Sequence, residues 1–262
     1  MYHRITVGSL VGAVALSTLM IPATAQADDS SGDIQITDVV VNGGKDIVLG
    51  TTDVKTFTIA VTATDDSGIK VGDTFPVLWH TRFPNGESYG LVIPEDIAGR
   101  CASKDSTTTT CTYTLKMNPR IDPQDNTTAG TWTVRAHVLA NDGDYLTKDS
   151  AAKAKVLRNS RLTVNAAPEP VKKNKTITVT GALTRANWET YKYAGYTKQP
   201  VKLQFKKKGT STYTTLKTVA TDSKGNLKTT TKATADGYFR YAFAGTSTTP
   251  AVASAADYVD VQ

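Results

Sequence analysis

Acidic side chains gather in two short segments rich in turn-forming residues. The first segment holds Asp65, Asp66 and Asp73, and the second holds Asp142, Asp144 and Asp149. Carboxylate oxygens are the ligands that a hard cation such as calcium takes, but neither segment has the glycine and glutamate spacing of an EF-hand. The alternative is a pair of polar turns in which the aspartates accept hydrogen bonds from their own backbone. The residues alone leave both interpretations open.

A second pattern, Gly86-Glu87-Ser88-Tyr89-Gly90, matches the sequence around the nucleophilic serine of α/β-hydrolases. That pattern functions on a sharp turn between a strand and a helix. Here it lies between two strand-like segments, and no helical periodicity follows it. We therefore interpret it as a glycine-rich turn, predict no catalytic residue and no required cofactor, and predict that the protein is not an enzyme.

The only two cysteines, Cys101 and Cys111, are expected to form a disulfide in an oxidising compartment. Their spacing does not fit Cys-x-x-Cys redox chemistry. The polar residues between them predict a hairpin tip. Closing so short a loop contributes roughly 3 kcal/mol in the chain-entropy model.

The N-terminus, residues 1–27, has the features of a secretory signal peptide. Arg4 precedes a mainly apolar stretch, and Ala25-Gln26-Ala27 places small residues at a cleavage site before Asp28. The alternative is a retained membrane anchor, although the apolar stretch is short for a span. No second apolar stretch follows, so we predict a secreted, extracellular protein without a transmembrane segment in the mature chain.

The two halves of the mature chain differ in charge. Residues 28–167 contain 18 acidic and 14 basic residues, whereas residues 168–262 contain 6 acidic and 15 basic residues. A change of this kind separates domains. We predict an acidic domain over 28–164, a proline-stiffened linker over 165–170 and a basic domain over 171–262.

Both halves are predicted to be made of strands. Apolar residues alternate with polar ones, as in the series Phe75, Val77 and Trp79, which we expect to face inward, and turn residues separate the segments. The expected strands of the first half are 33–41, 54–64, 74–83, 88–93, 109–117, 131–140 and 155–165. Those of the second half begin near 171 and continue over 175–181, 200–207, 213–221, 227–233, 238–244 and 257–262. Short strands without helices predict an all-β fold of β-sandwiches.

Several segments resemble immunoglobulin-like domains of bacteria. Gly130-Thr131-Trp132-Thr133-Val134, followed by Asn141-Asp142-Gly143, resembles the F strand and its turn. In the second half, 201–205, the turn at 221–226 and Gly237-Tyr238-Phe239-Arg240-Tyr241 resemble the repeats of secreted actinobacterial proteins. Nearly all of the chain after residue 32 is similar to a family of two-domain secreted actinobacterial proteins, some labelled calcium-binding. The resemblance implies two immunoglobulin-like β-sandwich domains in tandem, and it does not supply their role.

In that topology the two acidic segments lie at the same end of the first sandwich, because they are its B–C and F–G loops. Carboxylates from two loops then converge as a calcium site requires. The resemblance also separates Cys101 and Cys111 from the B and F strands, so the inter-sheet disulfide of antibody domains is not expected.

The second half offers two candidate binding features. Lys202, Lys206 and Arg240 are expected on the outer face of neighbouring strands, where a basic surface would suit an acidic polymer. No groove or stacking platform is evident there, so we predict no sequence-specific binding of nucleic acid. The alternative is a lysine-rich edge that prevents sheet aggregation.

The other feature is an aromatic segment, expected as a loop over 184–199. It contains Trp188, Tyr191, Tyr193 and Tyr196. Exposed rings at this density would stack on sugars. The loop is also expected beside the linker, which favours packing against the first domain; in that case Trp188 is buried, and otherwise its ring faces solvent.

The favoured function from these observations is a secreted, non-enzymatic binding or surface-display protein. Its expected ligand is a cell-wall polymer or another extracellular acidic polysaccharide. The alternative is a calcium-binding protein that uses the acidic loops of the first domain.

Overall fold

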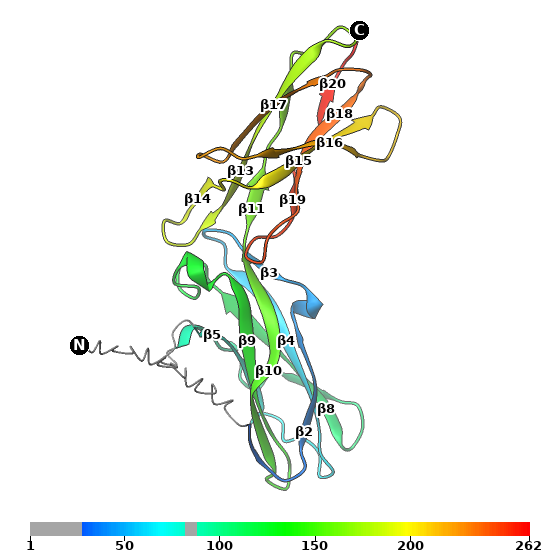
Figure 1. Cartoon of the computed structure of the whole chain (residues 1–262). Helices are drawn as coiled ribbons and strands as arrows, with labels where there is room; N and C mark the ends of the chain where they lie inside the picture. Colours follow the sequence, from blue (N-terminus) through cyan, green and yellow to red (C-terminus); the bar gives the residue numbers. More distant parts are fainter. Residues whose placement is uncertain (1–27, 82–87) are drawn as a thin grey trace, which may run out of the picture.

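The computed structural model describes residues 28–81 and 88–262. The predicted signal peptide, together with Gly86 and Glu87 of the hydrolase-like pattern, lies outside the described residues. Twenty strands and two short 3-10 turns make up the described chain, which forms an N-terminal and a C-terminal β-sandwich joined end to end (Figure 1). In the part of the chain that is described, no helix has the length and apolar character needed to cross a membrane.

Two sheets form the N-terminal sandwich. The first sheet has the order β1 (Asp29–Ser31), β10 (Tyr145–Arg158), β9 (Gly130–Leu139), β5 (Phe75–Thr81) and β6 (Ser88–Val92). The second sheet has the order β2 (Gln35–Val41), β4 (Lys55–Thr64), β8 (Thr108–Met117) and β7 (Arg100–Ser103). After β2 the chain crosses to the first sheet, where β3 (Ile47–Leu49) pairs in parallel with the end of β10. The first strand of the sandwich is therefore divided between the two sheets, as β2 and β3. Together with the Greek-key connections between the sheets, this arrangement defines an immunoglobulin-like sandwich.

The core of this sandwich follows the period-two pattern, with one correction. Trp132, Val134 and Ala136 of β9 are fully buried, as their alternation predicts. In β5 the predicted phase is wrong, because Thr74, Pro76 and Leu78 are buried while Phe75 is 38% exposed. The physical reason is the register with β9: Pro76 and Leu78 lie directly opposite buried Ala136 and Val134, and residues directly opposite each other share one face of a sheet.

The disulfide links neighbouring strands of one sheet. Cys101 in β7 and Cys111 in β8 are bonded and occupy directly opposite positions, with 3.9 Å between their Cα atoms. The expected disulfide and hairpin tip are therefore confirmed. The bond closes the edge of the second sheet and does not connect the two sheets.

The C-terminal sandwich is arranged around the long strand β13 (Thr176–Asn187). β13 pairs with β11 (Ser160–Leu162), β12 (Asn165–Ala167), β14 (Lys192–Gly195) and β17 (Asn226–Lys232). The facing sheet contains β16 (Thr214–Ala220), β15 (Pro200–Lys207), β18 (Gly237–Phe243), β19 (Val252–Ala253) and β20 (Asp257–Val259). Buried side chains from both sheets, including Ile177, Leu203 and Tyr241, form a second core.

The chain passes between the sandwiches at Asn159, between the end of β10 and the start of β11. Residues 165–167, predicted as the start of a linker, form β12 and pair with Thr178, Val179 and Thr180 of β13. The predicted loop over 184–199 also differs from the structure, since β13 runs to Asn187 and turns back as β14. Residues 165–167 show no apolar alternation, because they are one asparagine and two alanines.

Candidate metal centre

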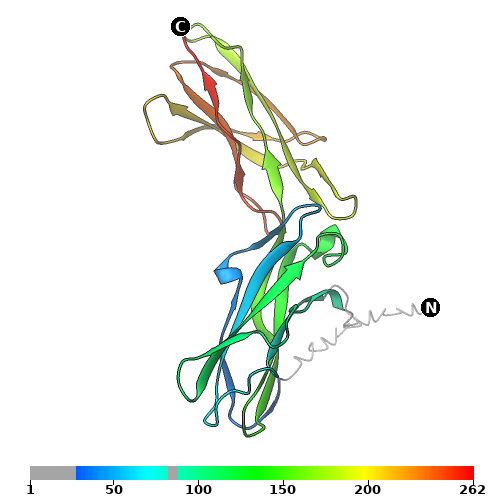
Figure 2. The same ribbon diagram turned by 180° about the vertical axis from the view of Figure 1, so that it is seen from behind.

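Two connections meet at the free end of the N-terminal sandwich, opposite the C-terminal sandwich (Figures 1 and 2). The β4–β5 connection and the β9–β10 turn lie side by side: the Asn141 backbone N–H donates to the Gly68 carbonyl over 3.0 Å, and the Asn141 amide donates to the Ser67 carbonyl over 2.9 Å. An isolated bridge between Ile69 and Ala140 continues the pairing. The predicted convergence of these two acidic segments at one end is therefore present.

Five aspartates share this end and fall into two overlapping groups of three. One group is Asp65, Asp66 and Asp142, and the other is Asp33, Asp65 and Asp144; within each group the carboxylate oxygens lie within 4.8 Å of one another. We call these five residues the acidic cluster. Ligand atoms at this spacing can share one ion whose oxygens lie about 2.3–2.6 Å from it.

Asp65 is the buried member of the acidic cluster. Its side chain is only 4% exposed, and Oδ1 accepts hydrogen bonds from the Ser67 backbone N–H (2.9 Å) and the Ser67 hydroxyl (2.6 Å). The Asp65 Oδ2 atom is buried without a hydrogen-bond partner among the described residues. A buried polar atom without a partner is costly, and a cation would satisfy this oxygen directly.

Asp144 is positioned by the segment before β2. Its Oδ2 accepts a hydrogen bond from the Asp33 backbone N–H over 2.9 Å, and its own backbone N–H donates to Asp142 Oδ1 over 3.0 Å. Gly32, at φ +80°, allows this approach, because a Cβ there would lie 1.4 Å from Asp144 Oδ2. The chain thus brings a third segment to the two predicted loops.

The crowding of carboxylates affects their protonation. The pKa of Asp33 is raised above its ordinary value, chiefly by the charge of Asp66, then by desolvation and by the charges of Asp65, Asp144 and Asp142. Like charges held together favour the protonated form. A bound divalent cation would remove this repulsion.

Asp73 and Asp149, predicted as members of the site, lie in ion pairs of their own. Asp73 pairs with Lys70 over 3.0 Å, and Asp149 pairs with Arg135 over 3.0 Å. Neither belongs to the groups that could hold an ion. Asp33 was missed, because its position depends on the pairing of β1 with the start of β10, a contact between residues more than one hundred positions apart.

The aromatic segment lies at the junction of the two sandwiches. Trp188 is 1% exposed, its indole N–H donates to the Gly50 carbonyl over 3.0 Å, and its backbone N–H donates to Asn126 Oδ1 over 3.0 Å. With Ala186, it belongs to the apolar core of the N-terminal sandwich. The predicted burial against the first domain is confirmed, and Trp188 presents no ring face to a ligand.

The tyrosines of this segment are also engaged near the junction. The Tyr193 hydroxyl accepts from the Asn159 amide over 3.0 Å, and the Arg161 guanidinium lies 3.6 Å from the Tyr193 ring centroid. Arg185 stacks on Tyr196 at 3.9 Å. Tyr191 is the most exposed of them at 42%, with Arg120 lying 5.4 Å from its ring. Their predicted use as a sugar-stacking platform has no support in this arrangement.

The predicted basic residues do share the outer face of β15 and β18. Lys206 lies 4.9 Å from the ring centroid of Tyr238, Arg240 lies 3.7 Å from that of Tyr213, and the Arg240 Nε donates to Gln204 over 2.8 Å. Lys202 is exposed on β15. Tyr213 and Tyr238, together with Tyr258 at 5.2 Å from Tyr238, were missed. The absence of sequence-specific binding of nucleic acid stays a prediction; the outward phase of Tyr238 beside buried Phe239 was the available signal for these rings.

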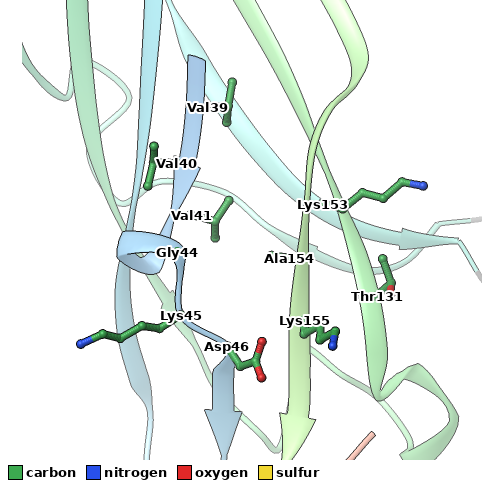
Figure 3. A pocket seen from close by; sticks show the side chains of 10 residues that line it. All are labelled: Val39, Val40, Val41, Gly44, Lys45, Asp46, Thr131, Lys153, Ala154 and Lys155. Atoms are coloured by element: carbon green, nitrogen blue, oxygen red, sulfur yellow. The ribbon is translucent and has the colours of Figure 1, made fainter. Parts of the chain in front are cut away.

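A groove of about 530 Å³ runs between the edges of β2 and β10 (Figure 3). Val39, Val41 and Ala154 line it, and the ammonium ends of Lys45 and Lys153 extend away from it (Figure 3). None of the predicted site residues lines this groove, so it is separate from the acidic cluster and from the basic face.

No protein-family model matches the sequence, and no curated protein matches it. Among solved structures, the chain is similar to the fibronectin(III)-like modules of Clostridium thermocellum CbhA, at 13% identity over 86% of this chain and 93% of that one, with a TM-score of 0.30. It is similar to the D00-D0 domain of intimin, at 14% identity over 85% and 99%, with a TM-score of 0.28. It is also similar to the amphioxus IgVJ-C2 molecule, at 10% identity over 81% and 98%, with a TM-score of 0.26.

The class of protein is defined by the strand order of the chain itself. It is an all-β protein of two immunoglobulin-like β-sandwich domains in tandem, with one disulfide and a buried aromatic contact between the domains.

Proposed function

We propose that this chain is a non-enzymatic extracellular protein that binds calcium through the acidic cluster of its N-terminal domain. The observation that carries the proposal is the Asp65 carboxylate, which is 4% exposed and keeps Oδ2 without a hydrogen-bond partner at the centre of the cluster. A buried carboxylate among four others costs free energy unless a cation compensates it.

The donor set fits calcium better than magnesium. All five candidate ligands are carboxylates on connections, which can supply the six to eight oxygens of variable geometry that calcium takes, together with backbone carbonyls and water. Magnesium requires a near-ideal octahedron at shorter distances. Calcium sites of extracellular modules have dissociation constants of about 10⁻⁴–10⁻³ M, and we expect an affinity in or above that range.

Thermal unfolding with and without calcium tests this function. A ligand at one hundred times its dissociation constant stabilises the folded state by about 2.7 kcal/mol. Calcium at about 10 mM, roughly one hundred times a dissociation constant of 10⁻⁴ M, should therefore raise the Tm by several degrees, and magnesium should raise it less. Asp65→Asn should abolish the shift, whereas Asp73→Asn, which removes only the ion pair with Lys70, should keep it. An unchanged Tm in calcium would contradict the proposal.

A second candidate function is binding of an acidic extracellular polymer by the C-terminal domain. It is supported by the alternation of cations and rings on β15 and β18, where Arg240 and Lys206 contact Tyr213 and Tyr238. Cations attract carboxylates or phosphates of a polymer, and tyrosine rings contact sugar faces. The surrounding half carries 15 basic and 6 acidic residues.

Affinity electrophoresis through gels containing polygalacturonate tests this second function, with neutral dextran as the comparison. The wild-type protein should be retarded by polygalacturonate and not by dextran. Replacing Lys206 and Arg240 with glutamine should reduce the retardation, whereas replacing Lys228 and Lys232, two exposed lysines on β17 of the opposite sheet, should not. Equal retardation of both variants would show that the retardation depends only on net charge, and it would contradict a binding site on this face.

A further inference from the structure

The five carboxylates of the acidic cluster form two groups rather than one. Its two groups, Asp33 with Asp65 and Asp144, and Asp65 with Asp66 and Asp142, have only Asp65 in common. Among the described residues, no fourth carboxylate joins either group at the same spacing. Each group by itself has the span in which one cation contacts three ligands.

The two groups also draw on different parts of the chain. Asp66 and Asp142 come from the β4–β5 connection and the β9–β10 turn, which already pair through Ser67: its hydroxyl accepts from the Asp142 backbone N–H over 3.2 Å. Asp33 comes from the short connection between β1 and β2, and reaches Asp144 through its backbone N–H. An ion bound by Asp65, Asp66 and Asp142 would hold the β4–β5 connection and the β9–β10 turn together. An ion bound by Asp33, Asp65 and Asp144 would also attach the segment between β1 and β2.

Asp65 has the placement required of a shared ligand. It is the one buried member, and the two Ser67 bonds on Oδ1 fix the orientation of its carboxylate. Oδ2 stays without a partner among the described residues. A carboxylate has two oxygens and about four lone-pair sites, so it can contact two cations at once. Five carboxylates beside one divalent ion would keep an excess of three negative charges, and two ions reduce the excess to one.

We infer that the acidic cluster is a two-ion calcium centre in which Asp65 bridges the ions. Asp66 and Asp142 complete one position, and Asp33 and Asp144 complete the other. The second position ties the segment that bears β1 to the end of the sandwich. This inference rests on the proposed calcium function and adds to it the number of ions and the ligands of each.

Calorimetric titration of calcium into the chelator-treated full chain tests the inference, with equilibrium dialysis as an independent count. The wild-type protein should bind two ions. Asp33→Asn and Asp142→Asn should each bind one, and Asp65→Asn should lose at least tenfold in affinity for both. Asp149→Asn, which breaks only the pair with Arg135, should still bind two. All four replacements are isosteric, and circular dichroism before titration verifies that each variant is folded.

The outcomes separate the inference from the proposed function. One ion bound by the wild type, with Asp33→Asn unchanged, would overturn the two-ion centre and leave calcium binding in place. No binding by the wild type would overturn both. Hydrogen exchange gives a second readout: calcium should slow exchange at Ser30 and Ser31 of β1 in the wild type and not in Asp33→Asn, and equal slowing in both would contradict the second position.

Discussion

The indole N–H of Trp188 donates a 3.0 Å hydrogen bond to the backbone carbonyl of Gly50, a residue of the other domain. The ring is 1% exposed and packs in the core of the N-terminal sandwich, although it belongs to the β13–β14 hairpin of the C-terminal sandwich. A side chain of the C-terminal domain is therefore part of the core of the N-terminal domain, and we expect the two domains to unfold together.

Trp188→Ala should weaken this connection. Truncating a buried tryptophan typically costs about 3–5 kcal/mol, and the loss falls on a contact between domains. Differential scanning calorimetry should show one cooperative transition for the wild type and two separated transitions for the variant. Tyr191→Ala is the control, because this neighbouring ring is 42% exposed; it should keep the single transition. A single, unshifted transition for Trp188→Ala would show that the domains are not coupled through this residue.

The disulfide should contribute measurably to the stability of the N-terminal domain. Cys101 and Cys111 close a loop with a sequence separation of 10, for which the chain-entropy model gives roughly 3 kcal/mol. Replacing both with alanine should lower the free energy of unfolding in urea by about 2–3 kcal/mol without changing the β-sheet circular dichroism. A loss below about 0.5 kcal/mol would show that the β7–β8 hairpin is equally ordered in the unfolded chain.

Gly32→Ala should impair the acidic cluster specifically. A Cβ at residue 32 would lie 1.4 Å from Asp144 Oδ2, so the carboxylate must move. Gly209→Ala is a matched control, since Gly209 has the same φ of +80° and open space around the added Cβ. Both variants should lose about 1 kcal/mol from the positive φ. Only Gly32→Ala should also have a smaller rise in Tm on addition of calcium, and equal calcium shifts in both would contradict the role of Asp144.

Alkaline pH should destabilise both domains through one buried tyrosine in each. Burial raises the pKa of Tyr113 and of Tyr241 to about 12, and their hydroxyls donate to the carbonyls of Thr74 and Val179. Because the folded pKa lies above the ordinary value of 10, the stabilisation is complete below pH 10 and is lost as the pH rises to about 12.

Denaturant unfolding at a series of pH values measures this loss. Tyr113→Phe and Tyr241→Phe should each make the decline in the free energy of unfolding above pH 10 shallower. The phenylalanine variants should be less stable than the wild type at pH 7 by about 1 kcal/mol, the contribution of one hydrogen bond. An identical decline in the variants would contradict the burial of these hydroxyls as its cause.

Much of the fold follows from local patterns in the sequence. Alternation predicts β9 and β18 well, because buried side chains alternate with less buried ones along each strand. The same approach misplaced the inward phase of β5, where a proline and a threonine are buried in place of aromatic rings. It also merged β11 with the end of β10 in one predicted strand over 155–165, and it missed β12; both β11 and β12 pair with β13 over only three residues.

The sequence predicts only part of the acidic cluster, because one of its members is positioned by a long-range strand pairing. Asp65, Asp66, Asp142 and Asp144 lie in loops whose meeting follows from the sandwich topology. Asp33 joins them only through the pairing of β1 with β10, which no short-range pattern indicates. Conversely, Asp73 and Asp149 lie close by in sequence but outside the cluster, where they pair with Lys70 and Arg135.

Calcium binding by the acidic cluster can be observed in the anomalous diffraction of crystals grown in calcium. We expect anomalous density beside Asp65, with carboxylate oxygens about 2.3–2.6 Å from the ion and contributions from Asp66 and Asp142. Crystals grown in excess calcium that diffract well and show no anomalous density within reach of the Asp65 carboxylate would contradict it.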